Sequence, residues 1–457
     1  MKKSMGRFCC FFVIISLSLV FRFVELAKNP YRISHDGKAY YNLAVNLING
    51  NGYTADISEP YEPYFWREPL YPIFLAMALS MPKMIGYNPE YVAYNAEVYT
   101  LDTHGRSHEF PMWEKLYLKI IQALLDALSV FVVYLMLVRF VDKRKALATA
   151  LMLGCFTAFL GVYALLLRET LQLFLMLLLS YWMIRYYDSR HVKHIIGGGI
   201  VSGLLTLTLQ ANALIVPLYC AYIIMLNIRA TRKLLWHTFL YGGLAILIVT
   251  PWLVRSYSYF EDIRVLRSMG MSLTFEQLSY IGSLGRAVKR NAITQEKQKE
   301  LGFINNSLSQ KDMIKHSLNG GYLRMADSLD ALAGTSASDK ARTPKNLTHR
   351  INRYLRGLIY YVTPRISFGG MYSMVKTYLF ALLALLGVPV ILKYFLKLRF
   401  IWPLLAFHLF MALRFGDESR RLIFMHYLVA TFASITILYA YEKLRKRNIR
   451  ESSQAVN

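Results

Sequence analysis

Apolar runs long enough to cross a membrane recur along the whole of this chain. A spanning helix needs about 20 mostly apolar residues to cross a hydrocarbon core of about 30 Å. Hydrophobic residues make up 55% of the 457 positions. We therefore predict an all-α polytopic membrane protein with about ten spanning helices, at 8–27, 115–138, 146–167, 170–187, 195–211, 213–228, 234–253, 372–393, 399–414 and 421–441.

Basic residues account for the net charge of +25 and gather mainly at the ends of these apolar runs. Short connections rich in Lys and Arg mark the cytoplasmic side of a membrane protein. Because membrane topology explains most of the positive excess, we expect no nucleic-acid partner. Six basic segments fall on one side of the predicted bundle, which we assign as cytoplasmic: the N-terminus, 139–145, 185–194, 229–233, 393–399 and 443–450.

The predicted spans divide the chain into three parts. Residues 1–256 form a transmembrane module whose first outer loop covers 28–114. Residues 257–371 form an extracytoplasmic loop or a small cap domain. Residues 372–457 form C-terminal transmembrane helices followed by a basic cytoplasmic tail.

Two helices in the first outer loop are predicted to lie at the membrane interface. The segment 39–49 has an apolar face and a second face that carries three asparagines, as an amphipathic helix on a membrane surface does. The apolar run 69–81 has 13 residues and would extend only about 20 Å as a helix, which is too short to cross. We expect it to be interfacial or re-entrant.

Ionisable side chains from separate segments reach the outer membrane face at one level. A single charge there often only marks the end of a helix, but acids and arginines from distant segments indicate a polar site. Deeper in the bundle, Asp126 is expected to make an interhelical hydrogen bond, and Arg22 is expected to pair with Glu25. The outer group comprises Asp36, Arg67, Glu68, Arg168, Glu169, Arg255, Asp417, Glu418, Arg420 and Arg421.

Several motifs occur in a fixed order at matching membrane positions. They are Asp36 followed by the amphipathic "YYNLAVNLINGNGY", then "REPLYP", "LLLRETLQLFLMLLL", "TPWLVRS" and "ESRRLIFMHYLVA". In that order the set resembles the GT-C glycosyltransferases, in particular the protein O-mannosyltransferases and the aminoarabinose-type lipid A transferases. The resemblance covers most of 1–256 and resumes at 372–441.

The resemblance implies a GT-C-like helical bundle and a donor sugar carried on a polyprenyl phosphate. It implies that Asp36 is the catalytic base, that Glu169 is a second acidic position of the active site, and that Arg67 acts there too. Two departures stand out. Gly37 follows Asp36 where a second acid is frequent, and Glu68 occupies the middle of the Arg-x-Pro motif.

The chemistry of such a transfer can be argued without the resemblance. An acceptor hydroxyl that attacks an anomeric carbon must lose a proton, and a positioned carboxylate can take it. A phosphate leaving group is already a stable anion, so it needs charge neutralisation rather than a general acid. A planar guanidinium binds phosphate through two hydrogen bonds, and Arg67 and Arg255 are the favoured candidates. Direct displacement predicts inversion at the anomeric carbon.

Other side chains beside these residues are candidates for substrate contact. No spacing of His, Cys, Asp or Glu identifies a metal site. The sequence therefore requires no cofactor and leaves a divalent metal open. The candidates for substrate contact are Glu68, Tyr64, Trp66 and Arg420.

The resulting hypothesis is an integral-membrane glycosyltransferase of a cell envelope, expected in a bacterial inner membrane with its active site on the extracytoplasmic side. Its partners would be a polyprenyl-phosphate-linked hexose or pentose, membrane lipid, and a glycan, lipid or protein acceptor. The rival hypothesis is a lipid-linked glycan flippase or other transporter, which should show paired halves around a midplane site. A third is a non-catalytic assembly subunit of the same fold.

Overall fold

Every element that the structure bounds is helical, which confirms the all-α prediction. The structure is a computed structural model that describes residues 2–28, 34–64, 67–89, 91, 112–158, 162–227, 231–260, 399–415 and 423–455, with isolated positions between 287 and 387. Within these residues, five segments are long and apolar enough to cross a membrane: Cys9–Ala27, Leu116–Leu137, Gln210–Asn227, Leu235–Tyr259 and Phe424–Leu444.

Nine of the ten predicted spans coincide with helices, and the tenth, 372–393, lies outside the described ranges apart from Gly387. The predicted span 146–167 is interrupted: its helix ends at Ala158 and a short 3-10 helix, η1 (Val162–Leu165), follows. At the C-terminus, α18 continues well beyond the predicted end at 441, to Ala455. The helices are α1 (Lys2–Lys28), α4 (Met112–Leu137), α5 (Lys143–Ala158), α6 (Glu169–Ser189), α7 (Val192–Thr208), α8 (Ile215–Asn227), α9 (Thr231–Phe260), α17 (Trp402–Phe415) and α18 (Ile423–Ala455).

Small residues allow α7 and α9 to pack closely. The α7 sequence contains three successive glycines and a fourth at Gly203. A Cβ atom added at Gly199 would lie 2.8 Å from the carbonyl oxygen of Tyr241 on α9, and one at Gly203 would lie 2.8 Å from that of Ala245. Such a stripe lets helix backbones approach each other within a membrane. The two helices therefore form a tight pair beside α6.

A buried ion pair joins α1 to α4. Arg22 is fully buried, and its terminal nitrogen lies 2.7 Å from Asp126 Oδ2. The Tyr427 hydroxyl of α18 donates to the other oxygen of Asp126. The expected interhelical role of Asp126 is thus confirmed. Arg22, which we expected to pair with Glu25 on its own helix, pairs with Asp126 of α4, a contact that the sequence did not indicate.

The first outer loop contains α2 (His35–Asn49) and α3 (Leu70–Met84), which pack against each other. Two of the three asparagines on the polar face of α2, Asn42 and Asn46, are buried, whereas Asn49 is exposed. The Asn46 side-chain amide donates to the carbonyl oxygens of Thr54 and Asp56, and its oxygen accepts from Asn51 and Tyr91. The polar face of α2 therefore organises the loop that follows it.

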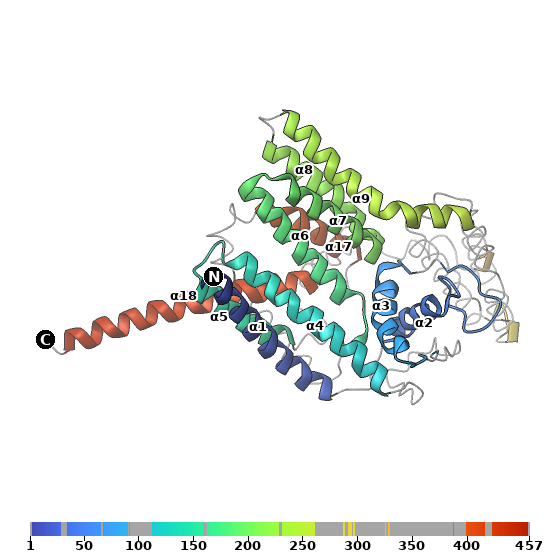
Figure 1. Cartoon of the computed structure of the whole chain (residues 1–457), viewed down its shortest axis with the longest axis horizontal. Coiled ribbons are helices and arrows are strands. Elements are labelled where there is room, and N and C mark those ends of the chain that lie inside the picture. Colours follow the sequence, from blue (N-terminus) through green and yellow to red (C-terminus); the bar gives the residue numbers. More distant parts are fainter. Residues whose placement is uncertain are drawn as a thin grey trace.

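The two ends of the bundle differ in what they carry. Figure 1 shows α2 and α3 at one end, beside the C-terminal end of α9, and the chain's N-terminus near the opposite end with α18 leading to the C-terminus. The α3 helix has 15 residues and falls short of the length required for a span. The first outer loop and the two termini therefore lie at opposite ends, as the basic residues predicted.

Candidate functional site

The site begins at the first turn of α2, which a serine fixes in place. Ser34 is the N-cap residue, and its Oγ accepts a hydrogen bond from the Gly37 amide at 2.9 Å. The same hydroxyl donates to the carbonyl oxygen of Leu165, 2.9 Å away, and the Ser34 amide donates to it as well. Asp36 lies in this turn, where a carboxylate is stabilised by the helix dipole. The start of α2 is thereby held against the segment that leads into α6.

Asp36 pairs with Arg67, which the sequence places 31 residues later. Arg67 Nη2 lies 2.6 Å from Asp36 Oδ1, and the guanidinium stacks over the Tyr40 ring at 5.2 Å. Both side chains keep roughly a fifth to a quarter of their surface exposed. Burial alone would lower the pKa of Arg67, but Tyr40 and Asp36 raise it above its ordinary value. Arg67 is therefore a permanent cation next to the expected base.

The loop backbone that carries Arg67 is held by a tyrosine. The Tyr53 hydroxyl donates to the carbonyl oxygens of Arg67, at 2.9 Å, and Glu68, at 3.1 Å. Tyr53 is buried, and burial raises its pKa well above the ordinary value. It therefore remains a hydrogen-bond donor throughout the physiological pH range and fixes the turn from which both side chains project.

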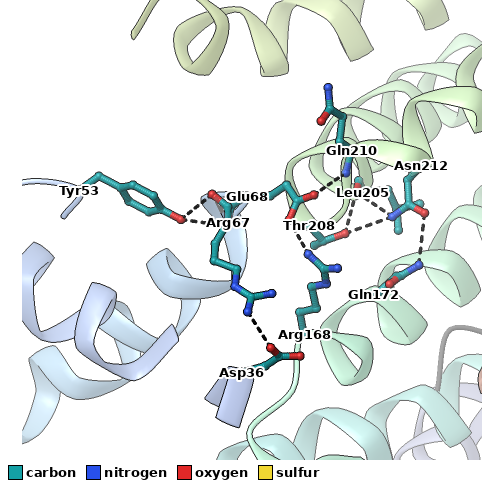
Figure 2. Close-up of polar contacts among 10 residues, drawn as sticks. All are labelled: Asp36, Tyr53, Arg67, Glu68, Arg168, Gln172, Leu205, Thr208, Gln210 and Asn212. Carbon is teal, nitrogen blue, oxygen red and sulfur yellow. Dashed lines mark hydrogen bonds and ion pairs between the residues drawn. The ribbon is translucent and has the colours of Figure 1, made fainter. Parts of the chain in front are cut away.

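Glu68, which had no clear role in the motif, joins two distant segments. One carboxylate oxygen pairs with Arg168, the N-cap residue of α6. The other accepts the Gln210 amide at 3.0 Å, at the start of the 3-10 helix η2 (Gln210–Leu214). Figure 2 shows the two pairs side by side, with Arg67 and Arg168 extending in opposite directions, Arg67 to Asp36 and Arg168 to Glu68.

Glu169, the first residue of α6, lies in the same charged group. Its side chain is buried, and its charge acts on Tyr40 together with the charges of Arg168, Arg67 and Glu68. Burial is the main cause that raises the pKa of Tyr40 to about 12. The structure thus brings the charges of four predicted outer-face residues around one neutral phenol.

Arg255 lies on α9 and contacts the first outer loop differently. Its two terminal nitrogens donate to the carbonyl oxygens of Tyr64, at 3.1 Å, and Tyr53, at 3.2 Å. The guanidinium also lies 4.6 Å from the centre of the Trp252 ring. Arg255 therefore attaches the loop backbone to α9, and Tyr64 takes part through its main chain.

Two of the predicted substrate contacts, Trp66 and Arg420, fall outside the residues that the structure describes, as do Asp417, Glu418 and Arg421. Within the described part of the chain, no three His, Cys, Asp or Glu side chains gather as ligands for a metal. Two acids of this site are engaged by arginines: Asp36 by Arg67 and Glu68 by Arg168.

Sequence reasoning missed the roles of Ser34, Tyr40, Tyr53 and Gln210, and it named Arg168 without assigning it a task. Ser34 carried a readable signal, because a serine before a helical run is a frequent N-cap. The other contacts join segments far apart in the sequence. The separation between Glu68 and Gln210 is 142 residues, so periodicity could not reveal it.

The comparisons with known proteins agree with this architecture. The family model described as dolichyl-phosphate-mannose-protein mannosyltransferase matches residues 114–254, which cover α4 to most of α9. No curated protein sequence matches the chain.

Solved structures share the fold of the whole chain. The archaeal oligosaccharyltransferase AglB from Archaeoglobus fulgidus, in complex with an inhibitory peptide and a dolichol-phosphate, aligns with a TM-score of 0.53 at 17% identity over 99% of this chain and 52% of its own. An oligosaccharyltransferase from Archaeoglobus fulgidus in the apo form aligns with a TM-score of 0.53 at 15% identity, over 98% of this chain and 52% of its own. The chain thus spans about half the length of these proteins.

At such low identity the structures establish a shared fold, and the family match covers the central helices. Together they confirm the resemblance that the ordered motifs predicted: residues 114–254 match the mannosyltransferase family model, and the chain shares the fold of an oligosaccharyltransferase.

Proposed function

We propose that this protein transfers a sugar from a polyprenyl-phosphate donor to an acceptor on the extracytoplasmic side of a bacterial inner membrane, with inversion at the anomeric carbon. The observation that carries the proposal is the Asp36–Arg67 pair, at 2.6 Å, beside Glu68 and Arg168 at the end of the bundle away from the termini. A carboxylate and two arginines at a membrane interface provide the base and the phosphate contacts that this reaction needs.

In this mechanism Asp36 removes the proton from the acceptor hydroxyl. The oxygen then attacks the anomeric carbon, the bond from that carbon to the phosphate oxygen breaks, and the electron pair leaves with the polyprenyl phosphate. Arg67 neutralises the leaving phosphate. Because Arg67 also pairs with Asp36, a donor phosphate that reaches Arg67 competes with Asp36 for the guanidinium. Donor binding thereby weakens the ion pair and makes Asp36 a stronger base.

We assign supporting roles to the second pair. Glu68 holds Arg168 and the start of η2, so it keeps a second cation beside Arg67. Glu169 adds negative charge near Tyr40 and orients the cluster or contacts the acceptor. Arg255 was a candidate phosphate ligand, but its terminal nitrogens hold two loop carbonyls. We therefore propose that it positions the loop instead.

The test is incubation of the purified full-length protein with a panel of radiolabelled polyprenyl-phosphate sugars and with glycan, lipid or peptide acceptors. Release of free polyprenyl phosphate identifies a donor. Replacement Asp36→Asn should lower kcat by about 10²- to 10⁴-fold, the usual contribution of a general base. Glu59→Gln, at an exposed carboxylate in the same loop, is the matched control and should leave kcat unchanged.

Arg67→Gln should act mainly on donor binding. Loss of a charge-assisted hydrogen bond costs about 1.5–3 kcal/mol, so the donor KM should rise roughly tenfold to hundredfold. An unchanged KM with a reduced kcat would show that Arg67 serves only Asp36. Activity that survives Asp36→Asn would remove the catalytic assignment, and passage of intact donor across vesicles without release of polyprenyl phosphate would favour a transporter.

A further inference from the structure

Two arginines share a tyrosine at the end of the bundle that is opposite the Asp36 site. Arg190 follows the last residue of α6, and its guanidinium lies 5.5 Å from the centres of the Tyr186 and Tyr187 rings. Arg399 begins the 3-10 helix η4 (Arg399–Ile401), lies 4.5 Å from the Tyr187 ring and donates to the Tyr187 hydroxyl. Tyr187 thus brings both cations to one place.

These cations have spare hydrogen-bond donors within the described part of the chain. Arg190 Nη1 and Arg399 Nε are buried and find no acceptor among the described residues. The Tyr222 hydroxyl of α8, whose residue is 4% exposed, likewise has none there, and the charges of both arginines act on it. Buried donors are almost always paired in folded proteins. Three donors at one place therefore indicate an anionic ligand that offers several oxygens.

The local charge also favours an anion. The carboxylate nearest in sequence, Asp188, is engaged by a third arginine, Arg139 at the end of α4. The group formed by Arg139, Arg190 and Arg399 therefore carries an excess of positive charge. Guanidinium groups suit phosphate because their planar donors match its oxygens.

An apolar cavity lies next to this group. It has a cavity volume of about 50 Å³, opens to the outside, and is lined by residues of α4, α6, η4 and α18 and of the turn after α4. Two of its lining residues directly follow arginines of the group in sequence, Phe140 after Arg139 and Phe400 after Arg399. The two phenylalanine rings stack, with their centres 5.9 Å apart. Along α18 the lining runs from Tyr427 to Ile435, about 12 Å at 1.5 Å per residue.

We propose that this place binds one anionic phospholipid of the leaflet on the side of the two termini. Arg190, Arg399 and Tyr222 donate to its phosphate, and one acyl chain enters the cavity. The cavity selects a lipid over free phosphate, because an apolar chain gains by leaving water whereas an inorganic anion makes no use of that surface. The positive excess selects an anionic head group over a zwitterionic one. The proposal does not depend on sugar transfer, since Arg168 lies at the N-terminal end of α6 and Arg190 at its C-terminal end.

The first experiment uses the wild-type chain alone. Full-length protein is stripped of lipid in detergent and titrated with palmitoyl-oleoyl phosphatidylglycerol, with the phosphatidylcholine of the same chains, or with inorganic phosphate, and bound lipid is counted by native mass spectrometry. We expect one phosphatidylglycerol to bind at least about tenfold more tightly than phosphatidylcholine. In a thermal unfolding measurement, phosphatidylglycerol should stabilise the protein and inorganic phosphate should not. Equal binding of the two lipids, or equal stabilisation by inorganic phosphate, would overturn the proposal.

The second experiment locates the site. The double variant Arg190→Gln/Arg399→Gln should bind phosphatidylglycerol roughly tenfold more weakly, which is the effect of about one charge-assisted hydrogen bond. Arg144→Gln removes an exposed arginine from the same end of the bundle and should change binding less than twofold. Val141→Trp, which fills the cavity beside Phe140, should weaken binding of both lipids. Equal effects of the double variant and Arg144→Gln would show that charge alone is sensed, and would refute a specific site.

Discussion

Four residues of the candidate active site form two neighbouring ion pairs, Asp36–Arg67 and Glu68–Arg168. The interaction energy within the second pair can be measured. Glu68 and Arg168 come from different segments and are both mostly buried. Removing one partner of a buried pair leaves the other charge uncompensated, whereas removing both often costs little. The loss of unfolding free energy on replacing either residue should therefore depend on whether the other residue is still present.

We expect a double-mutant cycle of Glu68→Gln and Arg168→Gln to give a coupling energy of about 1–2 kcal/mol, a value between those of exposed and buried pairs. The cycle is measured from unfolding free energies in detergent. The more exposed pair Lys145–Glu442, at 2.8 Å with 23% and 43% of the two side chains exposed, provides a matched cycle that should give a smaller coupling of at most about 0.5 kcal/mol. Equal coupling in the two cycles would contradict the burial argument.

Tyr40 makes the free energy of unfolding depend on pH in the alkaline range. Its pKa is raised to about 12 in the folded protein from an ordinary value of 10.0, mainly through burial. Because the unfolded chain loses this proton first, the stabilisation is complete below pH 10, declines between about pH 10 and 12, and is lost above that window. Wild-type unfolding free energy should fall across the window with a contribution of at most about 1.4 kcal/mol per pH unit.

The variant Tyr40→Phe lacks the titrating group and should show a correspondingly shallower fall. Chemical unfolding in detergent at pH 9, 10 and 11 measures the difference between the two proteins. Parallel curves for the wild type and Tyr40→Phe would mean that other tyrosines account for the whole dependence.

Among the elements, α2 and the loop after it were partly predictable. A serine N-cap and a glycine end are local signals, and the structure has Ser34 at the cap and Gly50 at φ 82° at the end. The burial of two of the three asparagines was not predictable, because the partners of Asn46 lie in a loop without regular periodicity. The same holds for the Arg22–Asp126 pair, since the sequence shows the neighbour three residues away but not the facing helix.

Arg255 tests whether α9 positions this loop. If it acts through the carbonyls of Tyr53 and Tyr64, then Arg255→Ala should loosen the loop even when no donor is present. Limited proteolysis of the detergent-purified protein should cleave the variant between residues 50 and 64 several-fold faster than the wild type. Arg67→Gln should not accelerate cleavage to the same degree, because the Tyr53 hydroxyl still holds its backbone. Unchanged proteolysis of Arg255→Ala would restore a direct role with the donor phosphate.

For the whole molecule, the sequence predicted the fold class and the relative placement of loops and termini better than the contacts. Apolar length and the distribution of lysine and arginine report how each segment meets the membrane, so the spans emerge from local composition. The contacts of the site depend instead on how α2, α6 and η2 pack, because this packing brings together Asp36, Arg67, Glu68 and Arg168. The ordered motifs predicted which segments meet, and the structure supplies their partners.

Sidedness is the whole-molecule property on which the proposed reaction depends, because the donor must be reached on the face that carries Asp36. Ile57 in the first outer loop is 46% exposed and Leu444 in the C-terminal half of α18 is 59% exposed. The first outer loop, with α2 and α3, and the C-terminal end of α18 lie at opposite ends of the bundle (Figure 1). In a background from which Cys9, Cys10, Cys155 and Cys220 have been replaced, Ile57→Cys should react with a membrane-impermeant maleimide in intact cells. Leu444→Cys should react only after permeabilisation, because its end carries the basic segments that remain cytoplasmic. The reverse pattern would place Asp36 on the cytoplasmic side and would exclude transfer to an extracytoplasmic acceptor.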